Sequence, residues 1–304
     1  MKRVGFAVGL AVVAVVVGVA AFGHGDRRPT SAGGLLVVAA ENSWGSIAAQ
    51  LGGDRVHVTS IITSPATDPH DYEPTPADAR ALAGAQMAIV NGIGYDPWAA
   101  KLIGANPVHG RIVLTVGALV GIEAGGNPHR WYSPSNVQQV IDQIVSDYSK
   151  LDAKDAPYFK RRQAIFETHG LAQYKTLIAT IKRKYHGVRV GASESIFAPL
   201  AQALGLDLIT PPAFLKAISE GVDPTAKDKA TIDRQIAKKQ IGVWIYNSQN
   251  GTPDVKRITD AARRKDIPVT TITETLVPAS ATFEAWQTAQ LRALRAALER
   301  ATGR

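Results

Sequence analysis

The chain alternates short apolar runs with longer segments of helical pattern, and this alternation constrains its fold more than any other feature. The runs are rich in Val, Ile and Leu, as expected of parallel strands that helices cover on both faces. They fall into two sets of four, at 35–39, 56–62, 88–91 and 112–116, and at 188–192, 206–210, 242–246 and 269–272. We therefore predict an α/β fold of two lobes, each a small parallel sheet flanked by helices.

The segment between the two sets shows no strand pattern from residue 156 to about 185 and contains a single glycine, Gly170. Asp155 is a suitable N-cap, and Gly187 can end a helix. Apolar residues recur between them at helical spacing: Leu171, Tyr174, Ile178 and Ile181. We predict one long, rigid helix over 156–186 that joins an N-terminal lobe, 35–155, to a C-terminal lobe, 187–304. Because a helix is stiffer than a loop, the lobes should move by only a small tilt.

The N-terminus has the pattern of an export signal. Lys2 and Arg3 precede an apolar run, 4–22, which a polar stretch with proline and glycine follows. The run is near the roughly 20 residues that span a bilayer and exceeds the usual signal-peptide core of about 7–15 residues. Residues 1–34 are therefore predicted to be a signal peptide or a membrane anchor, with a linker. The positive charge at the start directs the rest of the chain to the periplasm or the outer face of the cytoplasmic membrane.

The composition excludes several kinds of chemistry. The chain has no cysteine, which excludes disulfides, thiolate zinc sites, iron–sulfur clusters and cysteine nucleophiles. The net charge of +8 is compatible with nucleic-acid binding, but the basic residues are scattered and no nucleic-acid-binding motif is present. We therefore expect no nucleic-acid partner and interpret the basic clusters as solvated helix faces.

Two histidines lie in proline-containing loops that are far apart in the sequence. His70 follows the predicted strand 56–62 and has prolines on both sides, and His129 follows Pro128 in a second Pro-His loop. Proline fixes its own φ and biases the residue before it away from helix, so such a loop holds its histidine at a defined position. Ligands of α/β folds bind at the carboxyl ends of strands. The pattern favours two imidazoles at one site, most plausibly around a metal ion.

Two carboxylates occupy equivalent places in the second lobe. Glu194 follows the predicted strand 188–192, and Glu274 follows 269–272, so each would face the cleft between the lobes. With the two histidines they form a candidate N2O2 or N2O3 ligand set that would neutralise a divalent ion: His70, His129, Glu194 and Glu274. The pattern alone leaves other roles open. Glu194 could cap its helix, Glu274 could be a solvated acid, and each histidine could be an ordinary loop residue.

Three motifs resemble the metal-specific substrate-binding proteins of zinc/manganese ABC importers, the cluster A-I solute-binding family. They are DPHDYEPTP at 68–76, NGIGYDPW at 91–98 and NPHRWY at 127–132. Glu194 and Glu274 fall where the third and fourth ligands of the family lie, and the resemblance runs from about residue 35 to 301. It implies two α/β lobes joined by one long backbone helix, with one divalent ion per chain held as cargo in the cleft.

The resemblance also implies supporting residues around the ligands: Asp68, Tyr72, Glu73, Trp131 and Ser133. This chain departs from the family at Ser133, where an Asp is common, and at Glu274, one methylene longer than the usual Asp. Many zinc-selective members have a third ligating histidine, where this chain has Glu194. Two imidazoles with two carboxylates favour Mn²⁺ or Fe²⁺, although the Irving–Williams order makes Zn²⁺ bind such a site tightly too.

The sequence thus predicts an extracytoplasmic receptor, not an enzyme, that delivers Mn²⁺, Zn²⁺ or Fe²⁺ to an ABC importer permease with its cytoplasmic ATPase. We expect a monomer, membrane-associated if the N-terminal segment is retained. Two alternatives are a surface adhesin or interaction protein of the same fold, and a metal-dependent hydrolase. The hydrolase is the weaker alternative because no HExxH helix, nucleophile elbow or P-loop is present.

Overall fold

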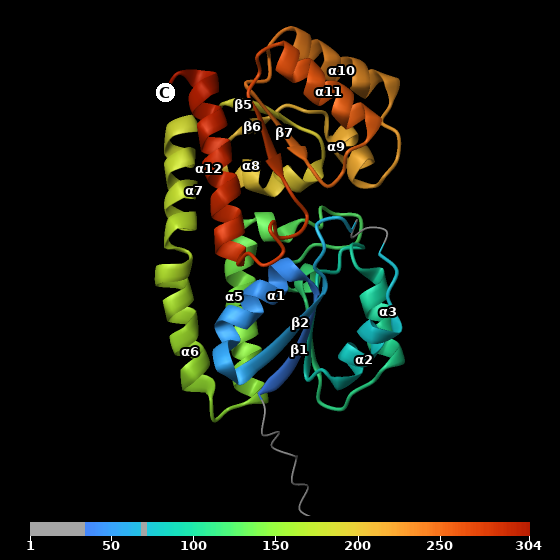
Figure 1. The fold of residues 1–304 in the computed structure, drawn as a ribbon, viewed down its shortest axis with the longest axis vertical. Coiled ribbons are helices and arrows are strands. Elements are labelled where there is room, and N and C mark those ends of the chain that lie inside the picture. Colours follow the sequence, from blue (N-terminus) through green and yellow to red (C-terminus); the bar gives the residue numbers. More distant parts are fainter. Residues whose placement is uncertain (1–33, 68–71) are drawn as a thin grey trace, which may run out of the picture. The chain divides into compact units, whose positions relative to one another are not determined.

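In the part of the chain that the structure describes, the strands form two four-stranded parallel sheets (Figure 1). The first has the order β2-β1-β3-β4, built from β1 (Leu35–Glu41), β2 (Val56–Ile62), β3 (Met87–Val90) and β4 (Ile112–Thr115). The second has the order β6-β5-β7-β8, built from β5 (Arg189–Ala192), β6 (Asp207–Leu208), β7 (Val243–Asn247) and β8 (Val269–Ile272). The predicted fold class, two small parallel sheets flanked by helices, is confirmed.

This computed structural model describes residues 34–67 and 72–304. The predicted N-terminal signal or anchor, Asp68 and His70 therefore lie outside the described residues. Within them, no helix is long and apolar enough to cross a membrane.

Helices cover both faces of each sheet. In the first half they are α1 (Asn42–Gly52), α2 (Pro76–Gly84), α3 (Pro97–Ala105), α4 (Val116–Leu119) and α5 (Pro134–Leu151). Figure 1 shows α2 and α3 on one side of the first sheet and α1 and α5 on the other. The second half contains α8 (Ala198–Leu204), α9 (Pro212–Ser219), α10 (Ala226–Ala237), α11 (Pro253–Arg264) and α12 (Phe283–Thr302).

Several helices begin where the sequence supplies a cap. Thr75 and Asp78 form a reciprocal capping box at the start of α2, with Pro76 in the first turn. Ser133 accepts a hydrogen bond from the backbone N–H of Asn136 and so caps α5. In the sequence, Thr75 and Ser133 stand a few residues after the predicted ligands His70 and His129. The caps therefore fix where α2 and α5 begin.

The segment between the sheets is helical, but it is not one uniform α-helix. α6 (Ala156–Ile165) leads into a π-helical turn, Phe166–Gly170, and α7 (Ala172–Tyr185) follows after Leu171. A Cβ atom at Gly170 would lie 2.8 Å from Cδ2 of Phe166, so the turn needs glycine at this position. The predicted single helix is thus interrupted at the tightly packed Phe166–Gly170 contact.

One hydrophobic cluster includes residues of both sheets, and α12 is central to it. α12 packs along α7 and also contacts α1. At its start, the backbone N–H of Phe283 donates to Ser46 Oγ at 2.8 Å, and Gln50 Nε2 donates to Glu284 Oε2 at 2.7 Å. The last helix therefore binds directly to the first, which adds a second connection between the two halves beside the α6–α7 segment.

Candidate metal centre

Three of the four predicted ligands lie within the described residues, and all three are buried. Glu194 and Glu274 follow β5 and β8 by two residues, and His129 directly precedes the short 3-10 helix Arg130–Tyr132. Their exposed fractions are 0% for His129, 1% for Glu194 and 4% for Glu274. Buried ionisable side chains are costly unless they are paired or bind a cation, so this burial needs an explanation at each residue.

The orientation of the His129 ring is fixed by Asn127. Nδ1 of His129 lies 2.9 Å from Oδ1 of Asn127, and the backbone N–H of His129 donates to the same oxygen at 3.0 Å. An amide oxygen only accepts, so Nδ1 carries the proton and Nε2 has the lone pair in the neutral ring. Nε2 lies 3.4 Å from Oε1 of Glu274. A lone pair and a carboxylate oxygen at this separation are stabilised by a cation that binds both.

Glu274 is held by donors from both halves of the chain. Its Oε2 accepts a hydrogen bond from the Tyr95 hydroxyl at 3.0 Å, and its Oε1 accepts one from Asn247 Nδ2 at 3.0 Å. Tyr95 lies in the loop after β3, and Asn247 is the last residue of β7. The longer side chain of Glu274 therefore reaches across to His129 in a defined orientation.

Glu194 is tied to the same network through its neighbour. Its Oε2 accepts a long hydrogen bond, 3.5 Å, from Ser219 Oγ, which also accepts from the backbone N–H of Ser195 at 3.0 Å. Asn127 Nδ2 donates to the carbonyl oxygen of Ser195 at 2.7 Å. One amide side chain thus orients His129 and fixes the loop that bears Glu194.

The described residues do not by themselves complete a metal cluster. Across 34–67 and 72–304, no group of three or more His, Asp or Glu side chains is arranged to hold a metal ion. The structure brings His129 and Glu274 together and connects Glu194 to them through hydrogen bonds. His70 is the fourth predicted ligand and lies outside the described residues, so the full set stays a prediction.

The predicted supporting residues fall into different roles. Trp131 is fully buried, and its ring meets that of His129 edge-on, with centroids 5.5 Å apart. Tyr72 donates from its hydroxyl to Asp78 Oδ2 at 2.8 Å and packs on Trp98, so it supports the start of α2. Ser133 caps α5, Glu73 is exposed, and Asp68 lies outside the described residues.

Four polar residues that the sequence did not single out hold the predicted ligands in place: Tyr95, Asn127, Ser219 and Asn247. Tyr95 and Asn127 lie inside two of the three motifs quoted above, so the sequence carries a signal for them. Asn247 directly follows the predicted strand 242–246 and is the last residue of β7, at the same edge of the sheet as the ligands. Ser219 lies at the end of α9 and has no sequence signal, because its role depends on tertiary packing.

A buried acidic pair stabilises the loop that contains Tyr95. Asp96 accepts hydrogen bonds from the backbone N–H groups of Asn91 and Gly92, each at 2.7 Å. Burial, together with the charge of neighbouring Asp96, raises the pKa of Glu41 well above its ordinary value. Asn91 Nδ2 in turn donates to the Pro128 carbonyl at 2.9 Å, next to His129.

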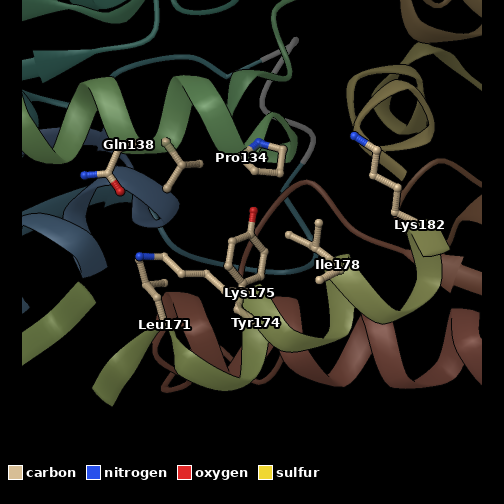
Figure 2. A pocket seen from close by; sticks show the side chains of 9 residues that line it. Pro134, Gln138, Leu171, Tyr174, Lys175, Ile178 and Lys182 are labelled. Carbon is tan, nitrogen blue, oxygen red and sulfur yellow. The ribbon is translucent and has the colours of Figure 1, made fainter. Parts of the chain in front are cut away.

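One cavity is lined by residues of this network, and a second is lined by none of them. The first, about 280 Å³, adjoins the predicted ligands and is lined in part by Tyr95, Asn127, Ser195 and Ser219. The second, about 300 Å³, lies between α5 and α7, where Figure 2 shows Pro134 and Gln138 facing Leu171, Tyr174 and Ile178. The lining of the second cavity is almost wholly apolar and includes none of the predicted ligands. We refer to the first as the mouth cavity.

The fold and the site define a two-sheet α/β protein with a buried histidine–carboxylate centre at the carboxyl ends of its strands. The chain matches the family described as zinc-uptake complex component A, periplasmic, over residues 37–297. The match covers most of the chain, and the chain belongs to this family. The relationship to metal-specific substrate-binding proteins of ABC importers, predicted from the motifs, is confirmed.

Curated relatives have low sequence identity to this chain, but the similarity covers most of its length. The manganese-binding lipoprotein MntA of Halalkalibacterium halodurans is 24% identical over 286 residues, which cover 91% of this chain and 83% of that protein. The iron-binding protein YfeA of Yersinia pestis is 25% identical over 236 residues, which cover 73% of this chain and 64% of that protein.

Solved structures share the fold at similarly low identity. The manganese-bound periplasmic metal binding protein of Candidatus Liberibacter asiaticus superposes with a TM-score of 0.72 at 19% identity, covering 87% of this chain and 99% of that one. The protein FpvC of Pseudomonas aeruginosa, in complex with Mn²⁺, gives 0.70 at 20% identity, covering 88% and 99%.

Proposed function

We propose that this chain is an extracytoplasmic receptor that captures one divalent transition-metal ion and delivers it to the permease of an ABC importer. The observation that carries the proposal is the pair of His129 Nε2 and Glu274 Oε1, 3.4 Å apart and buried, each oriented by its own hydrogen-bond partner. Metal-binding side chains are typically oriented by hydrogen bonds to neighbouring residues that do not themselves touch the metal. His70 and Glu194 would complete the set, with two ligands from each half of the chain.

The donor set supports Mn²⁺ as cargo, with Zn²⁺ as its strongest competitor and Fe²⁺ as a further candidate. Two imidazoles with two carboxylates form a harder site than a histidine-rich one. Two relatives support these cargoes, since one is a manganese-binding protein and the other an iron-binding protein. Zn²⁺ would still bind tightly in the test tube, so selectivity in the cell would depend on geometry and metal supply.

The proposed function is capture and release, not catalysis. The two halves would close around the ion by a small movement, because both the α6–α7 segment and the contact between α1 and α12 connect them. The metal-loaded monomer would then dock on the permease, whose cytoplasmic ATPase drives transport. The N-terminal segment would place the receptor in the periplasm or on the outer face of the cytoplasmic membrane.

Elemental analysis of the untagged protein tests this proposal. We expect about one equivalent of Mn or Zn per chain, and loss of the metal in His129→Ala and Glu274→Ala. His109→Ala is the matched control, because His109 is exposed and lies outside the predicted set. A protein that takes up no metal after incubation with Mn²⁺ and with Zn²⁺ would contradict the receptor function, and the interaction-protein alternative would then lead.

A further inference from the structure

We propose that the mouth cavity is the route by which the metal ion reaches and leaves its site, and that the Lys216–Glu220 ion pair at its edge controls the rate of passage. This inference rests on the receptor function proposed above. It adds a path for the ion and two residues that set the rate of its passage, Lys216 and Glu220. Neither residue is a predicted ligand.

Three residues that line the mouth cavity are hydrogen-bond partners of the predicted ligands. Tyr95 donates to Glu274, Asn127 binds the His129 ring, and Ser219 donates to Glu194. All three side chains line this one cavity of about 280 Å³. The cavity therefore lies one side chain away from three predicted ligands that are themselves buried. An ion in the cavity is therefore separated from these ligands by the side chains that hold them, and not by a strand of either sheet.

The edge of the cavity carries one cation and one anion. Lys216 and Glu220, at the end of α9 and just after it, form an i,i+4 ion pair, and about half of each side chain is exposed. A divalent ion that approaches is repelled by the lysine and attracted by the carboxylate, so the intact pair presents almost no net charge. Removal of one partner leaves the other charge unbalanced, and the two removals should change the association rate in opposite directions.

Glycines keep part of the wall open. Gly94 and Gly125 have φ values of +86° and +87°, and a Cβ atom at either position would meet nothing within 4 Å. A side chain there has space, and it would occupy part of the cavity mouth. Asn is the most suitable substitution because it tolerates left-handed backbone better than other residues with a Cβ. Gly121, in the same loop region, has a φ of +68°, is equally open and does not line the cavity.

The test is stopped-flow binding of Zn²⁺ and of Mn²⁺, followed by tryptophan fluorescence, together with equilibrium titration of the same variants. Trp131 contacts the His129 ring and serves as the reporter. We expect Glu220→Gln to slow association and Lys216→Gln to accelerate it, each by roughly 2–10-fold at low salt, with both differences shrinking as the ionic strength rises. Gly125→Asn should slow association and dissociation by the same factor and leave Kd unchanged, because it narrows a path and touches no ligand. Gly121→Asn should change neither rate.

Two results would overturn the inference. Unchanged association rates in Glu220→Gln, Lys216→Gln and Gly125→Asn, with normal Kd values, would mean that the ion uses another route while the receptor function stands. Equal slowing by Gly125→Asn and Gly121→Asn would mean that the effect comes from backbone strain. Failure of the wild-type protein to bind either metal is the distinct result that would contradict the proposed function itself.

Discussion

The hydroxyl of Tyr95 donates a 3.0 Å hydrogen bond to Oε2 of Glu274, a residue 179 positions later in the chain. The donor lies in a loop of the first sheet and the acceptor follows the last strand of the second sheet, so this one bond spans the proposed metal centre. Both groups are buried, and the ring of Tyr95 also packs edge-on against Trp131. The orientation of a proposed ligand therefore depends on a residue from the opposite half.

Tyr95→Phe should lower the affinity for Mn²⁺ and Zn²⁺ by about 10–100-fold, the usual effect of removing a residue that orients a metal ligand. The ring and its packing stay, and only the donor to Glu274 is lost. Isothermal titration calorimetry measures the change. Tyr158→Phe is the control, since that hydroxyl binds Asp54 far from the site. Wild-type affinity in Tyr95→Phe would show that the hydrogen bond does not position the carboxylate.

Asn127→Asp separates the two roles of Asn127. The carboxylate still accepts from Nδ1 of His129, but it cannot donate to the Ser195 carbonyl as Nδ2 does. We expect weaker metal binding and faster metal release, because the loop that bears Glu194 loses its connection to the His129 loop. Measured dissociation into excess chelator checks the release rate. A dissociation rate equal to that of the wild type would mean that the bond to Ser195 has no part in holding the ion.

Glu41→Gln should change how stability depends on pH. The pKa of Glu41 is raised in the folded protein, so the folded state binds more protons than the unfolded state. Its contribution to stability is therefore present below the unfolded pKa and is lost as the pH rises above that value and through the raised folded pKa. Gln has no such proton to lose, so the fall in stability with rising pH should be smaller in the variant. Urea unfolding at several pH values measures the free energy of unfolding, and parallel curves for the two proteins would contradict this expectation.

Gly170→Ala and Gly104→Ala should shift stability in opposite directions. A Cβ atom at Gly170 would overlap the Phe166 ring, and we expect a loss of about 1–3 kcal/mol in the free energy of unfolding. A Cβ atom at Gly104, near the end of α3, would meet no other atom within 4 Å, so alanine there should stabilise by about 0.4–1 kcal/mol. Chemical denaturation of both variants gives the comparison. A neutral Gly170→Ala would mean that the π-helical turn adapts to a side chain.

The sequence predicted the strands well because each is a short apolar run with clear boundaries. The predicted strand 206–210 is the weakest match, since β6 covers only Asp207–Leu208 and Pro211 leads directly into α9. The π-helical turn at Phe166–Gly170 could not be predicted, because it depends on how the Phe166 ring packs on Gly170. Helical spacing alone does not distinguish a continuous helix from an interrupted one.

Residue type and strand position were enough to predict where the candidate ligands lie in the chain, and their role as ligands stays a prediction. His129, Glu194 and Glu274 stand at loop positions that the pattern identified, and the structure places the first and last within 3.4 Å of each other. Ser133 was expected near the ligands from the resemblance, yet its hydroxyl caps α5, a role that Ser often takes before Pro at the first helical position. Ser219 and Asn247 reach the site only through tertiary packing.

The most direct test of the central claim is a crystal structure of the protein loaded with Zn²⁺, with anomalous scattering used to locate the metal. We expect one strong peak per chain about 2.0–2.1 Å from Nε2 of His129, with Glu274 as a further ligand and His70 and Glu194 completing the set. A peak elsewhere in the chain, or a metal held without His129 and Glu274, would contradict the account.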